Sequence, residues 1–209
     1  NGEWVSPAEP KFIQVIDPSN EEPCAEISIG GKKDVDKAVG AAKKAFDTWA
    51  FTKKEERLEL LEKLYVIYKK RWAEMAKLIT LEMGAPMKFS TEMQAATGAS
   101  HIKSFKNILK DFRFERDLGE EKNNQKLLYE PKGVCALITP WNWPINQVNL
   151  KVIPALASAC TVVLKPSEIA PLSSMLLAEM IDEVKFPSGV FNLVNGDGAV
   201  TGDALTSHP

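Results

Sequence analysis

The chain has 209 residues, 44% hydrophobic and 26% charged, a composition typical of globular proteins that excludes disordered, collagen-like and coiled-coil classes. Its 26 Lys and Arg residues nearly balance 28 Asp and Glu residues, so the chain lacks the basic field that would hold nucleic acid. No apolar run approaches the ~20 residues of a membrane helix, and Asn1–Trp4 lack a signal-peptide pattern, so no membrane partner is expected.

The chain begins with a predicted strand pair and helix. Lys11–Ile29 carries β-forming side chains on both sides of the turn-forming segment Asp17–Asn20, which predicts two short strands. Apolar residues at three- and four-residue spacing then predict a helix that Asp34 caps and that reaches Trp49.

Helical patterns continue through the rest of the first half. The T-x-x-E pattern of Thr52 and Glu55 predicts a capping box for the next helix. A further helix is expected over Trp72–Met83, where Gly84 ends it, and another over about residues 89–109.

The second half alternates between strands and helices. Residues 112–124 predict a linker or an exposed hairpin, and Leu127–Tyr129 a strand. Expected next are strands over Val134–Thr139, Thr161–Lys165 and Val190–Val194, and helices over Asn146–Ala159, Pro171–Val184 and Ala199–Leu205. This order predicts an α/β fold with a Rossmann-like parallel sheet flanked by helices. The expected parts are residues 1–111, the linker or oligomerisation hairpin 112–130, and the sheet portion 131–209.

Ligands of open parallel sheets bind beyond the carboxyl ends of the strands. The first such place is the loop Ile138–Pro144, which Pro140 and Pro144 stiffen. Asn142 lies between them, and its amide can donate two hydrogen bonds to an oxyanion. The alternative is an Asn that only closes a turn, but the Pro-Trp-Asn-Trp-Pro context favours the functional interpretation.

The second place is the segment Lys165–Glu168, directly after a predicted strand. The ammonium of Lys165 and the carboxylate of Glu168 are suited to bind ribose hydroxyls. A carboxylate here repels a 2′-phosphate and so favours NAD over NADP. The alternative, a solvated surface ion pair, is slightly favoured for this segment taken alone.

The third place is the glycine cluster of Gly196, Gly198 and Gly202. Glycines let the backbone approach a ligand, and N–H groups at a helix start attract phosphate. The spacing is one residue longer than the dinucleotide fingerprint and follows the third strand of this half, so the cluster is a weak signal by itself.

Taken together, Pro131–Pro209 resembles the cofactor domain of the aldehyde dehydrogenase superfamily. The similarity also covers the helical first half through Thr80–Pro86. The segments that carry it are Ile138–Pro144, Pro154–Ala157, Thr161–Glu168, Gly189–Val194, Gly196–Gly198 and Gly202.

The resemblance implies an enzyme that oxidises an aldehyde to a carboxylate with NAD(P)+. In this family a cysteine thiolate attacks the aldehyde to form a thiohemiacetal, an amide at the position of Asn142 holds the oxyanion, and a glutamate-activated water hydrolyses the thioester. The implied cofactor-binding residues are Ile138, Thr139, Pro140, Trp141, Lys165, Ser167, Glu168, Gly198 and Gly202. The implied edge of the aldehyde tunnel is Trp143, Gln147 and Leu150, for which ordinary packing is an equally good interpretation.

The family's nucleophile and general base have no counterpart in the sequence. Cys24, Cys135 and Cys160 do not match the nucleophile, and the last two are interpreted as buried structural thiols. Without CxxC spacing, and with His101 and His208 far apart, no metal site or disulfide scaffold is expected.

We therefore expect an incomplete aldehyde dehydrogenase fold, the N-terminal part of a subunit, without turnover as an isolated chain. The absence of an initiator Met fits a processed or partial chain. The expected full-length protein is a cytoplasmic homodimer or homotetramer that uses NAD. The alternatives are a non-catalytic nucleotide-binding or subunit-interaction module acting through residues 112–124, and a sister reductase of acyl phosphates or thioesters, against which the Pro-Trp-Asn-Trp-Pro loop argues.

Overall fold

A three-stranded parallel sheet forms the centre of the protein. The computed structural model describes residues 2–119 and 125–209. The strands are β5 (Val134–Ile138), β6 (Thr161–Lys165) and β7 (Phe191–Leu193), hydrogen-bonded in the order β5-β6-β7. The predicted α/β class with a parallel sheet is confirmed.

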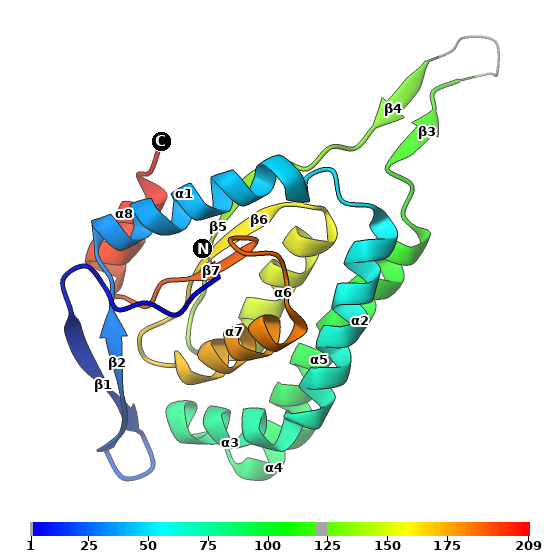
Figure 1. Cartoon of the computed structure of the whole chain (residues 1–209). Coiled ribbons are helices and arrows are strands. Elements are labelled where there is room, and N and C mark those ends of the chain that lie inside the picture. The colour runs from blue at the N-terminus through cyan, green and yellow to red at the C-terminus, as the bar shows by residue number, and fades with distance from the viewer. Residues whose placement is uncertain (1, 120–124) are drawn as a thin grey trace.

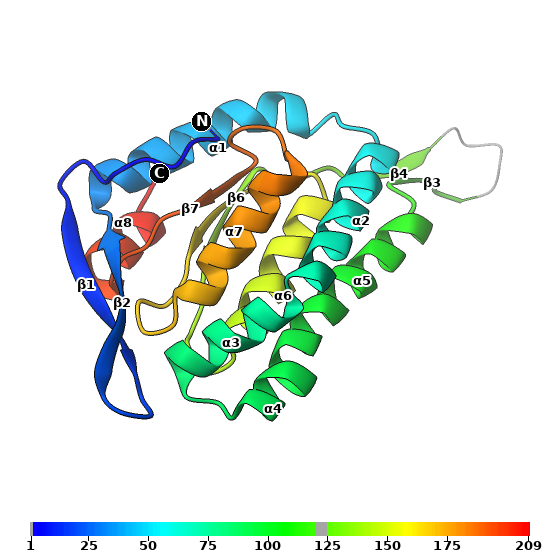
Figure 2. The ribbon, with the colours of Figure 1, turned by 60° about the horizontal axis from the view of Figure 1, so that its bottom comes forward.

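One face of the sheet is covered by α1 (Lys32–Trp49) and α8 (Asp203–Thr206), as Figures 1 and 2 show. Every residue of β6 is buried. Val163, in the middle of β6, belongs to the same small core cluster as Val35 and Ala42 of α1. The apolar stripe predicted for the first helix therefore packs on the sheet.

The opposite face packs against α6 (Pro144–Ala157) and α7 (Leu172–Val184). Val162 and Leu164 alternate with Val163 along β6 and belong to the large core cluster that includes apolar residues of both helices. Since side chains alternate across a strand, helices on both faces require the continuous apolar run that this strand has.

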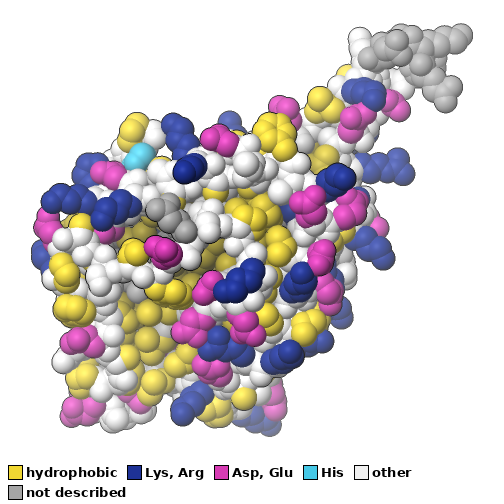
Figure 3. Space-filling view, in the orientation of Figure 1, with side chains coloured by type: hydrophobic (Ala, Val, Ile, Leu, Met, Phe, Trp, Pro, Cys, Tyr) yellow, Lys and Arg dark blue, Asp and Glu magenta, His cyan; other side chains and the backbone are white. Residues whose placement is uncertain are grey.

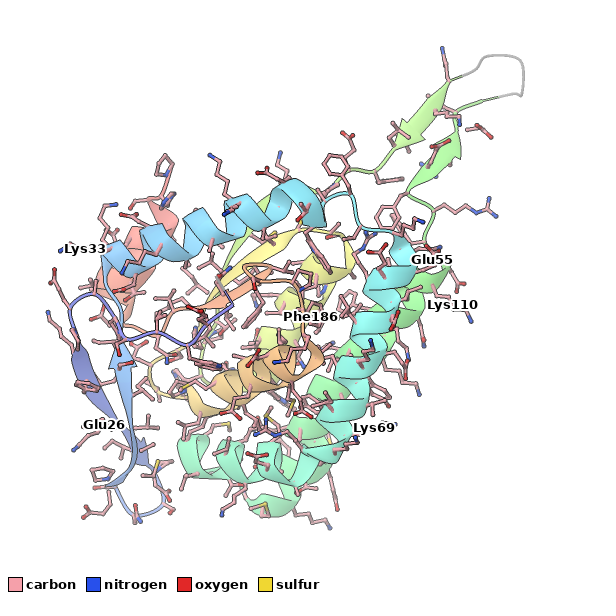
Figure 4. The ribbon with its side chains drawn as sticks, viewed as in Figure 1. Glu26, Lys33, Glu55, Lys69, Lys110 and Phe186 are labelled. Atoms are coloured by element: carbon pink, nitrogen blue, oxygen red, sulfur yellow. The ribbon has the colours of Figure 1, made fainter. Side chains whose placement is uncertain are left out.

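A second helical layer lies outside α6 and α7 (Figure 2). It consists of α2 (Lys54–Lys70), α3 (Trp72–Met83) and α5 (Ala95–Asp111), with the short α4 (Met87–Phe89) and a π-helical turn over Ser90–Gln94. The helix expected from about residue 89 thus begins with a π-helical turn. Figure 4 shows the start of α2, at the labelled Glu55, beside the end of α5, at the labelled Lys110.

Two antiparallel strand pairs lie outside the central sheet. β1 (Lys11–Asp17) pairs with β2 (Glu22–Ile29), as predicted. β3 (Glu115–Asp117) pairs with β4 (Lys126–Leu128) in a hairpin that projects from the body (Figures 1 and 3). The first strand of this hairpin, β3, falls within the segment 112–124 that was predicted as a linker or an exposed hairpin, while residues 120–124 lie outside the described residues.

The two predicted N-caps are wrong. Gly31 is the N-cap of α1, and Asp34 lies three residues further on, where its carboxylate accepts a hydrogen bond from the Gly31 N–H at 3.0 Å. The N-cap of α2 is Lys53, which makes no side-chain cap, and the Thr52 hydroxyl instead donates to the carbonyl of Trp49 at 2.6 Å. An N-cap side chain accepts a hydrogen bond from the second or third helical N–H, whereas an acidic residue at the third helical position accepts one from the N–H of the N-cap. Asp is common at both positions, so sequence alone does not separate the two.

The end of α3 is both a predicted stop and a tertiary anchor. Gly84 closes the helix with φ of 74°, a left-handed conformation that favours glycine. In the last turn, the Glu82 carboxylate is 1% exposed and accepts hydrogen bonds from the N–H groups of Leu172 and Ser173 at the start of α7. Burial raises the pKa of Glu82 to about 7, although these N–H groups lower it.

Among the described residues, no helix combines the length and the apolar character needed to cross a bilayer. On the face shown in Figure 3, charged side chains crowd over the outer helices, and apolar side chains are exposed between β2 and α7. Mixed charges of this kind produce no single-sign field over the surface.

We expect the Glu82→Gln variant to remove a pH dependence of stability. The folded pKa of about 7 exceeds the ordinary value of 4.5. The contribution of protonated Glu82 to the free energy of unfolding is therefore fully present below about pH 4.5 and is lost as the pH rises through 7. The loss amounts to about 3 kcal/mol. The measurement is urea unfolding from about pH 4 to pH 8, and parallel stability curves for the two proteins would contradict this role of Glu82. Glu82→Ala is the matched variant that removes the acceptor, and it should be less stable than Glu82→Gln at every pH.

Candidate functional site

The strand register brings the three predicted loops to one edge of the sheet. Ile138, the last residue of β5, is aligned with Lys165, the last residue of β6, and Leu164 with Leu193 of β7. Backbone hydrogen bonds continue past the strands: Thr139 N–H donates to the Lys165 carbonyl at 3.2 Å, and Val194 N–H to the Leu164 carbonyl at 2.9 Å. We call this edge, with the loops that leave it, the rim.

The centre of the rim is an ion pair between Lys165 and Glu168. The ammonium nitrogen lies 2.8 Å from a Glu168 carboxylate oxygen. Lys165 is only 3% exposed, whereas 34% of the Glu168 side chain is exposed. The alternative of a solvated surface pair is therefore wrong for the lysine. Ser167 between them is also buried, and its hydroxyl accepts the N–H of Ile169 at 3.2 Å.

The loop after β5 presents its polar tip to solvent. Asn142 is exposed, as are the neighbouring Trp141 and the strand's last residue, Ile138. Trp143 turns inward, and its ring packs on Phe89 with 5.6 Å between ring centroids. One tryptophan thus anchors the loop while the other faces outward with the amide.

Two further residues of this loop flank the amide. Pro140 is exposed, and Pro144 begins α6, where a proline's missing N–H costs no hydrogen bond.

The hydroxyl of Thr139 is buried and has no hydrogen-bond partner among the described residues. A buried hydroxyl without a partner beside a strand end is a group that a ligand or water satisfies.

The glycine segment after β7 has one structural glycine. A Cβ placed on Gly196 would lie 1.8 Å from the hydroxyl oxygen of Thr201. That hydroxyl is buried and donates to the Gly30 carbonyl at 2.5 Å, which ties the segment to the end of β2. Gly196 is therefore needed for close packing, a requirement that glycine spacing alone does not reveal.

The other glycines of the segment lie in a π-helical turn over Gly198–Gly202. A Cβ on Gly198 would meet open space, so this position is accessible to a ligand. The carboxylate of Asp197 accepts the Val200 N–H at 2.7 Å. The Val200 N–H is therefore already paired within the chain. Asp197 caps the start of this turn, which the sequence analysis did not predict.

The three residues implied for the aldehyde tunnel lie along one side of α6. Trp143 precedes the helix, Gln147 is half-buried with its side-chain oxygen 3.3 Å from the ammonium of Lys151, and Leu150 is exposed. The opposite side of the helix is buried in the core, where Asn149 donates to the Gly98 carbonyl at 3.0 Å. The role of the tunnel residues stays a prediction.

Two of the three cysteines lie at the end of the sheet opposite to the rim. Cys135 is near the start of β5, Cys160 directly precedes β6, and Cys24 is in β2. All three are free thiols. Cys160 is buried, as predicted, whereas Cys135 is only partly buried, so its interpretation as a buried thiol is wrong. Among the described residues, no group of three or more His, Cys, Asp or Glu side chains is arranged to hold a metal ion.

A sequence profile described as the aldehyde dehydrogenase family matches residues 4–209. The chain belongs to the aldehyde dehydrogenase family. A curated relative from Pseudomonas, named 3-succinoylsemialdehyde-pyridine dehydrogenase, is 50% identical over the whole chain and 43% of its own length.

Solved aldehyde dehydrogenases have the same fold. The enzyme from Bartonella henselae is 57% identical, with a TM-score of 0.97 over all of this chain and 44% of its own. An aldehyde dehydrogenase C variant from Pseudomonas syringae, solved with NAD+ and octanal, is 43% identical with a TM-score of 0.96, again over all of this chain and 42% of its own. The chain thus spans less than half the length of the aldehyde dehydrogenases it matches.

Proposed function

We propose that the protein with this chain oxidises an aldehyde to a carboxylate and uses NAD+ as the electron acceptor. The observation that carries this proposal is the convergence of three loops at one rim, in a chain of the aldehyde dehydrogenase family. NAD+ supplies the chemistry of hydride acceptance when it is bound. Support for this cofactor also comes from the Pseudomonas syringae enzyme, whose structure contains NAD+.

The Lys165–Glu168 pair is suited to bind the adenosine ribose. An ammonium has three donors, and the described residues give that of Lys165 one partner, Glu168. One carboxylate oxygen of Glu168 likewise has no partner among the described residues, and the side chain is partly exposed. Together they offer donors and an acceptor to a diol, with Ser167 holding the turn between them.

The remaining rim residues would complete the cofactor site. The segment of Ile138, Thr139, Pro140 and Trp141 would flank the cofactor with an apolar surface and with the Thr139 hydroxyl, to which no described residue is hydrogen-bonded. Gly198 and Gly202 would lie beside the adenine and pyrophosphate, where the open side of Gly198 admits a close approach.

Asn142 would stabilise the oxyanion that forms when a thiolate adds to the aldehyde carbon. Its amide is exposed at the tip of a loop that two prolines and the packed Trp143 hold in place. A donor fixed before the reaction stabilises developing charge without reorganisation during the step. Trp143, Gln147 and Leu150 would form one edge of the aldehyde path.

The protein would act as a homodimer or homotetramer in a reducing cytoplasm. The β3–β4 hairpin projects from the body, so its strand edges are available to another subunit (Figure 1). Three free cysteines are consistent with a reducing compartment.

We expect Asn142→Ala to lower kcat of the full-length enzyme by about 10²- to 10³-fold, because it removes one oxyanion donor. The dissociation constant for NAD+, measured by calorimetry, should change by less than about twofold. Asn142→Asp is the matched control of the same size: it replaces the donor with a negative charge and should be at least as slow. Equal losses of turnover and cofactor affinity would make Asn142 a structural residue.

We expect wild-type protein to bind NAD+ more tightly than NADP+, and Glu168→Gln to narrow that difference. The uncharged side chain no longer repels a 2′-phosphate, while it binds ribose hydroxyls less well. Glu179→Gln, at an exposed glutamate that pairs with Arg71, is the control and should leave both affinities unchanged. Calorimetric titration of both cofactors measures the effect, and tighter binding of NADP+ to the wild type would overturn this role of Glu168.

The 209 residues alone should show no NAD-linked aldehyde oxidation. Cys135 and Cys160 lie at the opposite end of the sheet, and the Cys24 thiol donates to the carbonyl of Val15, so we expect none of them to attack an aldehyde at the rim. The assay is NADH absorbance with purified chain and a panel of aldehydes. Turnover above that of a Cys24, Cys135 and Cys160 triple serine variant would contradict the expectation.

A further inference from the structure

Asn146 lies in the first turn of α6, among the residues implied for the aldehyde path. Residues three, four and seven positions apart share one side of a helix, so Asn146 and Gln147 lie between Trp143 and Leu150. The side chain of Asn146 is half-buried, and no side-chain hydrogen bond caps α6. Asn146 is therefore a polar group on the side of α6 that the resemblance assigns to the aldehyde.

His101, on α5, fixes the orientation of the Asn146 amide. Nε2 of His101 lies 2.7 Å from Oδ1 of Asn146. An amide oxygen accepts hydrogen bonds and donates none, so Nε2 carries a hydrogen and donates it. The amide nitrogen lies on the other side of the carboxamide group, and its two N–H groups have no partner among the described residues. The pair thus presents two donors whose direction is set before a ligand binds.

The part of this side that is nearest to Asn142 is aromatic. The ring of Trp143 packs on that of Phe89 with 5.6 Å between centroids, and Phe89 is still 38% exposed. Such rings contact a hydrocarbon chain well. Asn146 follows Trp143 by three residues, which corresponds to a rise of about 4.5 Å on a helix. An acceptor atom a few carbons from the aldehyde carbon would therefore reach the amide of Asn146.

The charges of the two helices disfavour a cationic ligand. Lys151 is the one charged residue of α6, and the sequence of α5 contains three lysines but a single acidic residue, at its last position. Glu62 of α2 pairs with one of these lysines, Lys106. The positive charge that remains repels a cation and attracts an anion. An uncharged or anionic oxygen is therefore the acceptor that fits this place.

We propose that His101 and Asn146 select aldehydes that carry an acceptor oxygen, of a carbonyl or a carboxylate, a few carbons from the aldehyde group. This inference rests on the proposed dehydrogenase function and names its class of substrate. The N–H groups of Asn146 donate to that oxygen, and His101 positions them through Oδ1. An apolar chain leaves these donors unpaired once the path is closed from water, which lowers its relative rate.

The test compares kcat/KM of the full-length enzyme for three aldehydes with NAD+. Pentanal is the apolar reference. Levulinaldehyde carries a ketone on its fourth carbon and succinic semialdehyde a carboxylate carbon at the same place, so the two separate hydrogen bonding from attraction of charge. We expect both to exceed pentanal in kcat/KM by at least about tenfold, the effect of one hydrogen bond of ordinary strength.

Variants assign this preference to the pair. Asn146→Leu keeps a similar size but removes both donors, and it should lower the preference for levulinaldehyde over pentanal by about tenfold. His101→Leu should lower it as well, whereas His101→Gln, which keeps an N–H donor, should restore most of it. The matched control is Asn107→Leu, the same substitution at an exposed residue of α5, and it should leave all three values unchanged.

Equal kcat/KM for the three aldehydes, or an unchanged preference in both Asn146→Leu and His101→Leu, would overturn this inference while the dehydrogenase function stands. A preference confined to succinic semialdehyde that survives Asn146→Leu would assign selection to the lysines and overturn it too. No NAD-linked oxidation of any of the three would overturn the proposed function and this inference with it. If Asn146→Leu fails to fold, the comparison of His101→Leu with His101→Gln decides.

Discussion

Parallel pairing of β5, β6 and β7 is the constraint on which the rest of the structure depends. Parallel strands run in one direction, so the loops after all three must leave the sheet at the same edge. The register aligns Ile138 with Lys165 and Leu164 with Leu193, which sets the three loops side by side. Lys165 and Val163 point to the same face of β6. A one-residue slip of this strand would turn both side chains to the other face, so the packing of β6 also fixes the positions of the rim residues.

The same pairing places the polar loop residues and two of the cysteines at opposite ends of the strands. The carboxyl ends of the strands carry the amide, the ammonium and the carboxylate, while Cys135 and Cys160 lie at the amino ends. Glu82 strengthens this arrangement, because it links α3 to the start of α7 directly after the loop that contains Lys165 and Glu168.

Patterns that depend on neighbouring residues could be read from the sequence. The apolar run of β6, the helical stop at Gly84 and the paired strands of Lys11–Ile29 are local features and were predicted. The three loops were also identified as candidate ligand positions, because strand order implies a common edge. Aldehyde dehydrogenase membership followed from the combination of these segments.

Features that depend on distant contacts could not be predicted. Glu82 accepts from residues 90 and 91 positions later in the chain, so its burial is invisible to local pattern. The need for Gly196 arises from a threonine hydroxyl that bonds to Gly30, at the end of another sheet. The π-helical turn over Ser90–Gln94 interrupts a sequence whose spacing fits a regular helix.

The burial of Lys165 is the clearest case in which structure changes the interpretation of a motif. A lysine removed from water is stabilised only when its ammonium is paired and hydrogen-bonded, since desolvation of a charge costs several kcal/mol or more. The described residues supply one partner, Glu168, which is itself partly exposed. A ligand with hydroxyl groups would satisfy the remaining donors and the free carboxylate oxygen together. The cost of burying the lysine therefore argues for a ligand at this edge of the sheet more strongly than the residue types do.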